Sequence, residues 1–331
     1  MPFNRLQRRE FLALLANGAA AWPLTADAQQ FATPVIGLLN GMSADTYADR
    51  MAAVRQGLAD SGFAEGRNLA IEYRAAEGHY DRLRGLAAEL VRLRVGVIVT
   101  IGSSMAARAA KAATTEIPIV FMLGADPVAT GLVSSLNRPS GNLTGVTNFA
   151  VELAAKRLQL LREIKPEADV IAYMINSSNV VSEADAKVVV ESGRAIGCRI
   201  IVLRAATEQE IDTAMTTIAQ QGIPVMLQGD ALFSSRRDQI VKLAARHAIP
   251  VMHANRASVL AGGLVSYAPD VLAMTRLAGV YAGRILKGAK PSDLPVQQPT
   301  KYELVINLKS AKAIGIAIPS TVLARADEVV E

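Results

Sequence analysis

Short apolar runs alternate with amphipathic stretches along most of the chain. Runs such as 95–101, 117–123 and 170–175 are too short for a helix and suit strands that are buried on both faces. Between them, apolar residues recur at helical spacing, as in 45–62, where Gly62 marks a helix end. The alternation predicts parallel sheets covered by helices.

The alternation occurs as two consecutive sets, with a break near Phe149. The first set predicts strands at 34–40, 68–74, 95–101, 117–123 and 143–147, and helices at 45–62, 80–93, 103–115 and 127–136. The second set predicts strands at 170–175, 199–203, 224–228, 250–253 and 263–267, and helices at 152–164, 183–196, 208–221 and 234–247. A helix at 271–286, a proline-rich loop and a strand near 304–306 follow.

This pattern predicts an α/β protein with two doubly wound parallel-sheet lobes. We expect a first lobe at 29–149 and a second lobe at 150–268. Residues 269–331 are expected to cross back and complete both lobes. A body of this length exceeds the usual size of one domain, which agrees with two cores.

The first 28 residues have the order of an export signal. Arg8 and Arg9 precede an apolar stretch that is too short to span a bilayer, and Ala26-Asp27-Ala28 is an A-x-A cleavage signal. Arg-Arg-x-Phe-Leu also resembles the twin-arginine signal of bacteria, although Gln7 and Ala13 depart from it. The alternative is an ordinary amphipathic helix. We expect cleavage near Ala28 and a periplasmic protein, exported by either the twin-arginine or the general secretory route.

Composition narrows the function classes. Removing the signal leaves 32 basic residues (35 − 3) against 28 acidic ones (30 − 2), a mild excess that does not favour nucleic-acid binding. No later run reaches the length of a membrane span. Cys198 is the only cysteine, so an internal disulfide is excluded. We expect a soluble monomer.

Small polar residues follow nearly every predicted strand, and parallel sheets bind ligands beyond the carboxyl ends of their strands. Gly102-Ser103-Ser104 enters a helix, whose free N–H groups suit a carboxylate. Asp126 and Asp230 are placed to meet a ligand amine. Each of these residues could instead be a helix cap. The candidate ligand-binding residues are Ser43, Ser103, Ser104, Asp126, Thr147, Asn148, Asn176, Asp230 and Tyr267.

A serine hydrolase is a less favoured alternative. Residues 102–106 approximate G-x-S-x-G around Ser104, and Asp230 with His247 or His253 would complete a triad, but Ala106 replaces the last glycine. The histidines lack metal-ligand spacing, and the phosphate-binding glycine motifs are absent. We therefore expect no catalytic residues, metal or cofactor.

Three long stretches resemble one known family. They are "GLADSGFAEGRNLAIEYRAAEGHYDRL", "KAATTEIPIVFMLGADPVATGLVSSLNRPSGNLTGVTN" and "VYAGRILKGAKPSDLPVQQPTKYELVINLKSAKAIGI". They are similar to ABC-transporter substrate-binding proteins of the tryptophan/tyrosine type. The resemblance implies a type I periplasmic-binding fold with a multi-strand hinge and one ligand in the interlobe cleft. One departure is Asn176-Ser177-Ser178-Asn179, where relatives often carry Asn-Pro-x-Asn-Pro.

The expected function is capture of a small organic ligand, an amino acid or related carboxylate, and its delivery to a membrane permease. A ligand-sensing receptor of the same fold is the main alternative, because sensing and transport would use the same cleft. Residues 228–231 vary across the family and are expected to tune the ligand.

Overall fold

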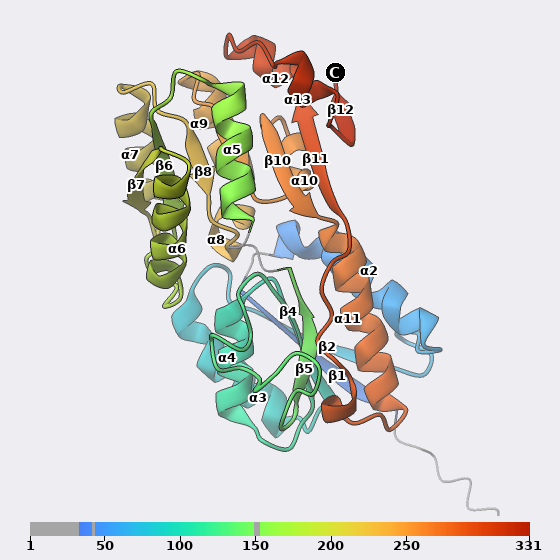
Figure 1. Cartoon of the computed structure of the whole chain (residues 1–331). Helices are drawn as coiled ribbons and strands as arrows, with labels where there is room; N and C mark the ends of the chain where they lie inside the picture. The colour runs from blue at the N-terminus through green and yellow to red at the C-terminus, as the bar shows by residue number, and fades with distance from the viewer. Residues whose placement is uncertain (1–32, 42–43, 149–152) are drawn as a thin grey trace, which may run out of the picture. The chain divides into compact units, whose positions relative to one another are not determined.

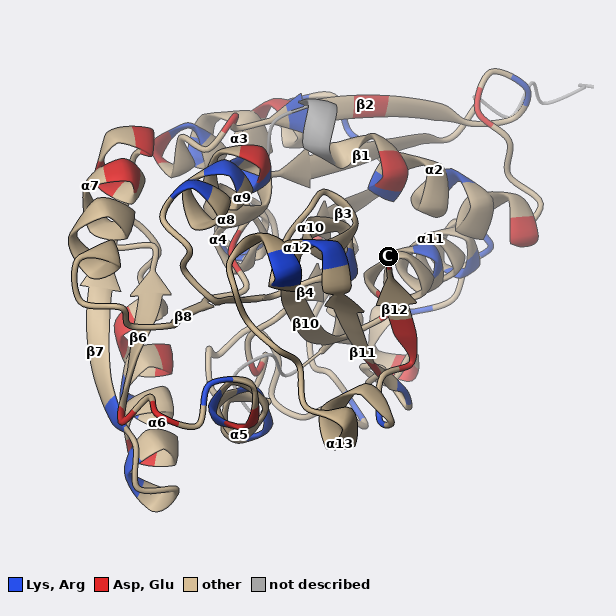
Figure 2. Cartoon of the chain, turned by 90° about the horizontal axis from the view of Figure 1, so that it is seen from above, with Lys and Arg blue, Asp and Glu red and all other residues tan. Residues whose placement is uncertain are grey.

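The computed structural model of the protein describes residues 33–41, 44–148 and 153–331, and Pro34–Glu331 forms one compact unit. The export signal and Ser43 lie outside the described residues. In the described part of the chain, no helix is long and apolar enough to cross a membrane. Lys and Arg are interspersed with Asp and Glu over the helices of both sheets (Figure 2).

The first sheet has five parallel strands in the order β2-β1-β3-β4-β5. It is built from residues predicted as strands, and its central strands β1, β3 and β4 are buried on both faces. Helices α3 and α4 pack together on one face, and α2 and α11 pack together on the other (Figure 1). The bounds are β1 Val35–Asn40, α2 Ala44–Asp60, β2 Ala70–Ala75, a 3₁₀ turn η1 at Tyr80–Arg82, α3 Leu83–Arg92, β3 Val97–Ile101, α4 Ser104–Ala113, β4 Ile119–Leu123 and β5 Leu143–Thr147.

The second sheet has seven strands in the order β12-β11-β10-β9-β8-β6-β7, all parallel except at the β10–β11 pair. Strand β6 of this sheet is buried on both faces. Ile171, Tyr173 and Ile175 belong to the core on one face, and Ala172 and Met174 belong to the core on the other. The bounds are α5 Ala154–Ile164, β6 Val170–Ile175, α6 Ser182–Ala195, β7 Arg199–Arg204, α7 Glu208–Ala219, β8 Val225–Leu227, α8 Ala231–Ser235, α9 Arg237–Arg246, β9 Val251–His253, α10 Arg256–Leu260 and β10 Val265–Pro269.

The last segments of the chain join both sheets. Helix α11, Val271–Leu286, packs against α2 and contributes to the core of the first sheet. Gly57 of α2 and Gly279 of α11 allow this close approach, because a Cβ at either one would collide with the backbone of the facing helix. The chain then returns to the second sheet through η2 Pro291–Asp293, β11 Tyr302–Asn307, α12 Leu308–Ala313, α13 Ser320–Leu323 and β12 Glu328–Val330.

Two helix predictions differ from the structure. Residues 127–136 form turns, not a helix: Asp126 caps one turn, and Gly131 then adopts a φ of 69°. A positive φ of this size ends helical geometry and is readily reached only by glycine. The predicted helix 234–247 is split into α8 and α9 at Arg236, whose backbone leaves helical geometry. The helical region also begins earlier than predicted, because Asp230 caps the start of α8.

Candidate functional site

A pocket lies between the two sheets, where the carboxyl ends of their strands face each other. Strand order changes direction within each sheet. The change falls between β1 and β3 in the first sheet and between β6 and β8 in the second. Ligands of open parallel sheets bind outside the strand ends at such switch points. The segments that follow β3, β6 and β8 all contribute to the pocket.

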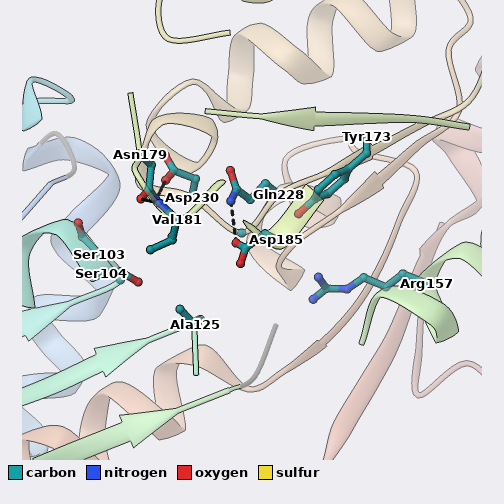
Figure 3. A pocket seen from close by; sticks show the side chains of 13 residues that line it. Ser103, Ser104, Ala125, Arg157, Tyr173, Asn179, Val181, Asp185, Gln228 and Asp230 are labelled. Carbon is teal, nitrogen blue, oxygen red and sulfur yellow. Dashed lines mark hydrogen bonds between the residues drawn. The ribbon is translucent and has the colours of Figure 1, made fainter. Parts of the chain in front are cut away.

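The pocket contains about 450 Å³ of space, counting the part that is open to solvent. Its apolar side chains are few, and polar ones predominate (Figure 3). The lining residues are Gly102, Ser103, Ser104, Gly124, Ala125, Arg157, Tyr173, Asn179, Val181, Asp185, Gln228, Gly229 and Asp230.

Asp230 is buried and accepts hydrogen bonds from several groups of the protein. Its Oδ1 accepts from the Asn176 side-chain amide at 2.8 Å and from the Leu232 backbone N–H at 2.8 Å. Its Oδ2 accepts from the Asn179 amide at 2.8 Å. The carboxylate therefore caps α8 and fixes the β6 and β8 ends to each other. This position combines the two roles that the sequence left open, a helix cap and a pocket residue.

Tyr80 reaches Asp230 from the helices of the first sheet. The Tyr80 hydroxyl donates to Oδ1 of Asp230 at 2.9 Å, and both residues are buried. Burial and then the Asp230 charge raise the pKa of Tyr80, so the hydroxyl keeps its proton and remains a donor. Gly41 makes room for the ring, since a Cβ there would lie 2.7 Å from Cε1 of Tyr80.

Asp185, near the start of α6, has a different environment from Asp230. The only described residue that donates to its carboxylate is Gln228, whose amide lies 2.8 Å from Oδ2. Burial raises the pKa of Asp185 to about 6, the Gln228 hydrogen bond opposes this, and the charge of Asp230 adds to it. The Asp185 carboxylate is desolvated and forms no ion pair with a described residue. A bound ammonium group would stabilise its ionised form.

Arg157, on α5, extends its guanidinium toward the same space (Figure 3). Its Nε donates to the backbone carbonyl of Tyr267 at 2.8 Å, which fixes the side chain in place. The residue is only 4% exposed. Burial lowers the pKa of Arg157 to about 10, and the hydroxyls of nearby tyrosines, Tyr173 first, oppose the shift. Arg157 therefore places a buried positive charge beside the pocket.

The two serines before and at the start of α4 differ in role. Ser103 accepts from the Ala106 N–H at 3.2 Å and is a helix cap. Ser104 also lines the pocket, and Figure 3 shows its hydroxyl directed into it. With the N–H groups of the first turn of α4, Ser104 can bind a carboxylate oxygen.

The other predicted residues surround the pocket without lining it. Asp126 accepts from the N–H groups of Val128 and Ala129, as a cap does. Thr147 donates to the carbonyl of Ala125 at 2.8 Å. Asn176 positions Asp230 and donates its own N–H to the Gln228 side chain.

Asn148 and Tyr267 also lie outside the lining. Oδ1 of Asn148 is buried without a hydrogen-bond partner in the described structure. The ring of Tyr267 stacks on Tyr302 at a centroid distance of 6.0 Å, and its carbonyl holds Arg157.

The hydrolase alternative lacks a base. Ser104 and Asp230 do line one pocket, but none of the described residues lining it is a histidine. His253 is buried elsewhere, and burial lowers its pKa to about 4. A search of the described residues also finds no cluster of three or more His, Cys, Asp or Glu residues that could hold a metal ion.

Arg157, Tyr173 and Asp185 were not predicted from the sequence, because none of them lies in a segment that directly follows a predicted strand. Arg157 and Asp185 lie within helices, and Tyr173 lies within a strand. The sequence signal that could have identified them is a charged residue at a helix position whose spacing predicts burial. Arg157 occupies a position on α5 between apolar residues that pack into the core.

Comparison with known proteins identifies the family. A family model described as "ABC transporter substrate binding protein" matches residues 35–330. The chain belongs to this family. This ABC transporter substrate-binding protein has the two-sheet α/β architecture of type I periplasmic binding proteins, as the sequence predicted.

Three relatives are informative. A "Tyrosine-binding protein" of Clostridioides difficile strain R20291 is 27% identical over 259 residues, which is 78% of this chain and 74% of the relative. A Streptococcus pneumonia domain in complex with L-Trp is 26% identical, with a TM-score of 0.82 over 90% of this chain and 100% of that one. A ligand-free, open substrate-binding protein from Clostridium difficile is also 26% identical, with a TM-score of 0.63 over 90% and 99%.

Proposed function

We propose that this protein captures an amino acid in the periplasm and delivers it to the permease of an ABC importer. The observation that carries the proposal is one pocket that brings together a desolvated carboxylate, Asp185, and the start of α4. The α-carboxylate of the ligand binds Ser104 and the first turn of α4, and its ammonium group binds Asp185. The relatives bind tyrosine or L-Trp, which supports an amino acid as the ligand class.

Capture depends on two lobes, one around each sheet, that close over the ligand. The present structure is more similar to the L-Trp complex than to the open relative, at the same sequence identity. The hydrogen bond from Tyr80 to Asp230 supports the closed arrangement. We propose that residues 269–271 and 297–301 connect the lobes as part of a hinge and that the protein acts as a monomer.

Export precedes this function. The paired Arg8 and Arg9 and the Ala26-Asp27-Ala28 segment support a cleaved signal peptide. Protein isolated from the periplasm should begin within a residue or two of Gln29. Replacing Arg8 and Arg9 together by lysine should block export by the twin-arginine route, while unchanged export would leave the general secretory route.

Equilibrium dialysis with labelled amino acids, individually and in competition, tests the proposed function. We expect at least one amino acid to bind with one site per chain. Binding should be lost in Asp185→Asn and retained in Asp238→Asn, a surface carboxylate that pairs with Arg237. If no amino acid binds, the proposed function is wrong.

A further inference from the structure

We propose that Gln228 is a positioning residue: its side-chain amide, fixed by neighbouring groups, holds the Asp185 carboxylate in the orientation that receives the ammonium group of the ligand. This inference rests on the proposed function, because it concerns how the same pocket binds an amino acid. Gln228 directly follows β8, is only 3% exposed and lines the pocket. Its amide nitrogen lies 2.8 Å from Oδ2 of Asp185 (Figure 3).

The orientation of the Gln228 amide is set by two donors. Its Oε1 accepts from the backbone N–H of Asn176 at 3.0 Å and from the hydroxyl of Ser182 at 2.8 Å. A backbone N–H can only donate, so the amide oxygen must face Asn176 and the amide NH₂ group must face Asp185. A flipped amide would bring two donors together and leave buried polar groups unsatisfied, which is costly.

The backbone of Gln228 and the helix that carries Asp185 are fixed to each other as well. The Gln228 N–H donates to the carbonyl of Met174 on β6 at 3.0 Å. Ser182 and Asp185 are three residues apart on α6, so they lie on one face of that helix, and the Gln228 amide bonds to both. One side chain therefore connects the Asp185 carboxylate to the end of the second sheet.

Asp185 retains an oxygen for a ligand, in contrast to Asp230. The Asp230 carboxylate already accepts from four groups of the protein through both of its oxygens. Gln228 bonds to Oδ2 of Asp185, and no described residue donates to Oδ1. A buried carboxylate oxygen without a donor can accept a charge-assisted hydrogen bond from an ammonium group.

The hydrogen bond from Gln228 also favours the ionised form of Asp185, which an ammonium group requires. Burial raises the pKa of Asp185 to about 6, the Gln228 bond lowers it, and the charge of Asp230 raises it further. The other titratable groups among the described residues that line the pocket are Tyr173 on β6 and Arg157 on α5. Substitution of Gln228 leaves all of these groups in place, so its effect on the titration of Asp185 measures one hydrogen bond.

Titration of Asp185 in the ligand-free protein tests the inference. Gln228→Met keeps the length of the side chain but removes the donor, so the pKa of Asp185 should rise by about one pH unit. The resonance of the Asp185 carboxyl carbon, identified with Asp185→Asn, measures this by NMR. Gln159→Met is the matched control, because the exposed Gln159 donates to Glu163 on the surface of α5. An unchanged pKa in Gln228→Met would contradict the inference.

Calorimetry across the same pH range relates this hydrogen bond to binding. The probes are the amino acids that bind in dialysis, beginning with L-tyrosine and L-tryptophan. In Gln228→Met the affinity should begin to fall about one pH unit higher than in the unaltered protein. A purely structural role would weaken binding equally at every pH, and that result would overturn the inference while the proposed function stands.

A second variant covers the case in which Gln228→Met does not fold. Ser182→Ala removes one of the two donors that orient the Gln228 amide, and Ser182 lies outside the pocket lining. It should move the pH profile of binding in the same direction by a smaller amount, and an unchanged profile would contradict the inference. If no amino acid binds to the unaltered protein, the inference and the proposed function are both wrong.

Discussion

The hydroxyl of Tyr80 donates to Oδ1 of Asp230 across the space between the two sheets, at 2.9 Å. Tyr80 lies in the turn η1 before α3, and Asp230 follows β8 as the N-cap of α8. This hydrogen bond between two side chains joins the helices of the first sheet to the strand ends of the second. The same carboxylate orders Asn176 and Asn179, so contact between the lobes and the shape of the pocket depend on one group.

Tyr80→Phe should favour the open arrangement. A hydrogen bond to a charged group contributes about 1.5–3 kcal/mol. Its loss should increase the radius of gyration measured by X-ray scattering without added ligand and weaken ligand binding. Tyr281→Phe is the matched control, because the Tyr281 hydroxyl donates to the carbonyl of Pro295, whose neighbours Leu294 and Val296 belong to the core of the first sheet. Equal radii of gyration for the two variants would show that the Tyr80 bond does not hold the lobes together.

Ser103→Ala and Ser104→Ala should separate stability from affinity. Loss of the Ser103 cap should lower the free energy of unfolding by about 1 kcal/mol. Loss of the Ser104 hydroxyl should weaken ligand binding by about 10- to 150-fold, if it bonds to a ligand carboxylate, with little change in stability. Chemical denaturation and calorimetry measure the two quantities. Unchanged affinity in Ser104→Ala would place the carboxylate site elsewhere.

Ligand affinity should fall at acid pH because of Asp185. Its pKa is raised to about 6, and binding an ammonium group requires the ionised carboxylate. Below that pH the protonated form predominates, so the dissociation constant should rise about tenfold for each further pH unit. Calorimetry between neutral and acid pH measures the slope. Asp238→Asn should show the same slope, and an affinity that stays constant as the pH falls below about 6 would contradict this role of Asp185.

Asp185→Asn should also raise thermal stability. A folded-state pKa above the ordinary value of 3.8 means that ionised Asp185 destabilises the fold above pH 6. This destabilisation decreases as the pH falls from about 6 toward 4. The melting temperature of Asp185→Asn at neutral pH should therefore exceed that of the unaltered protein, by about 2–4 °C for each kcal/mol gained. A lower melting temperature would indicate a structural role for the carboxylate.

Packing of α11 on α2 should depend on Gly57. A methyl group at Gly57 would collide with the carbonyl oxygen of Arg276, and overpacking costs typically about 1–3 kcal/mol. Gly85→Ala is the control, since Gly85 is exposed on α3 with nothing within 4 Å of its added Cβ. We expect Gly57→Ala to be destabilised and Gly85→Ala to be stabilised by roughly 0.5–1 kcal/mol. Equal stabilities would contradict the close helix packing.

Local patterns were sufficient to predict most of the strands and helices, because the central strands are buried on both faces and most helices are amphipathic. Strand β6 and helix α11 have the predicted bounds, 170–175 and 271–286. The patterns failed at 127–136, where Asp126 and Gly131 together make a turn from residues with helical spacing.

The pocket was only partly predictable. Ser103, Ser104 and Asp230 were found because the carboxyl ends of parallel strands are a general ligand position. Arg157 and Asp185 were not, because their contribution depends on how α5 and α6 pack beside β6. Strand order also places β3 and β8 at the switch points, and order within a sheet cannot be read from local periodicity.

The central claim is that an amino acid binds in this pocket with its ammonium group at Asp185. The most direct measurement is thermal unfolding of the unaltered protein, Asp185→Asn and Asp238→Asn against a panel of amino acids. The account predicts that an amino acid which raises the melting temperature of the unaltered protein also raises that of Asp238→Asn and leaves Asp185→Asn unchanged. An amino acid that stabilises all three proteins equally would contradict it.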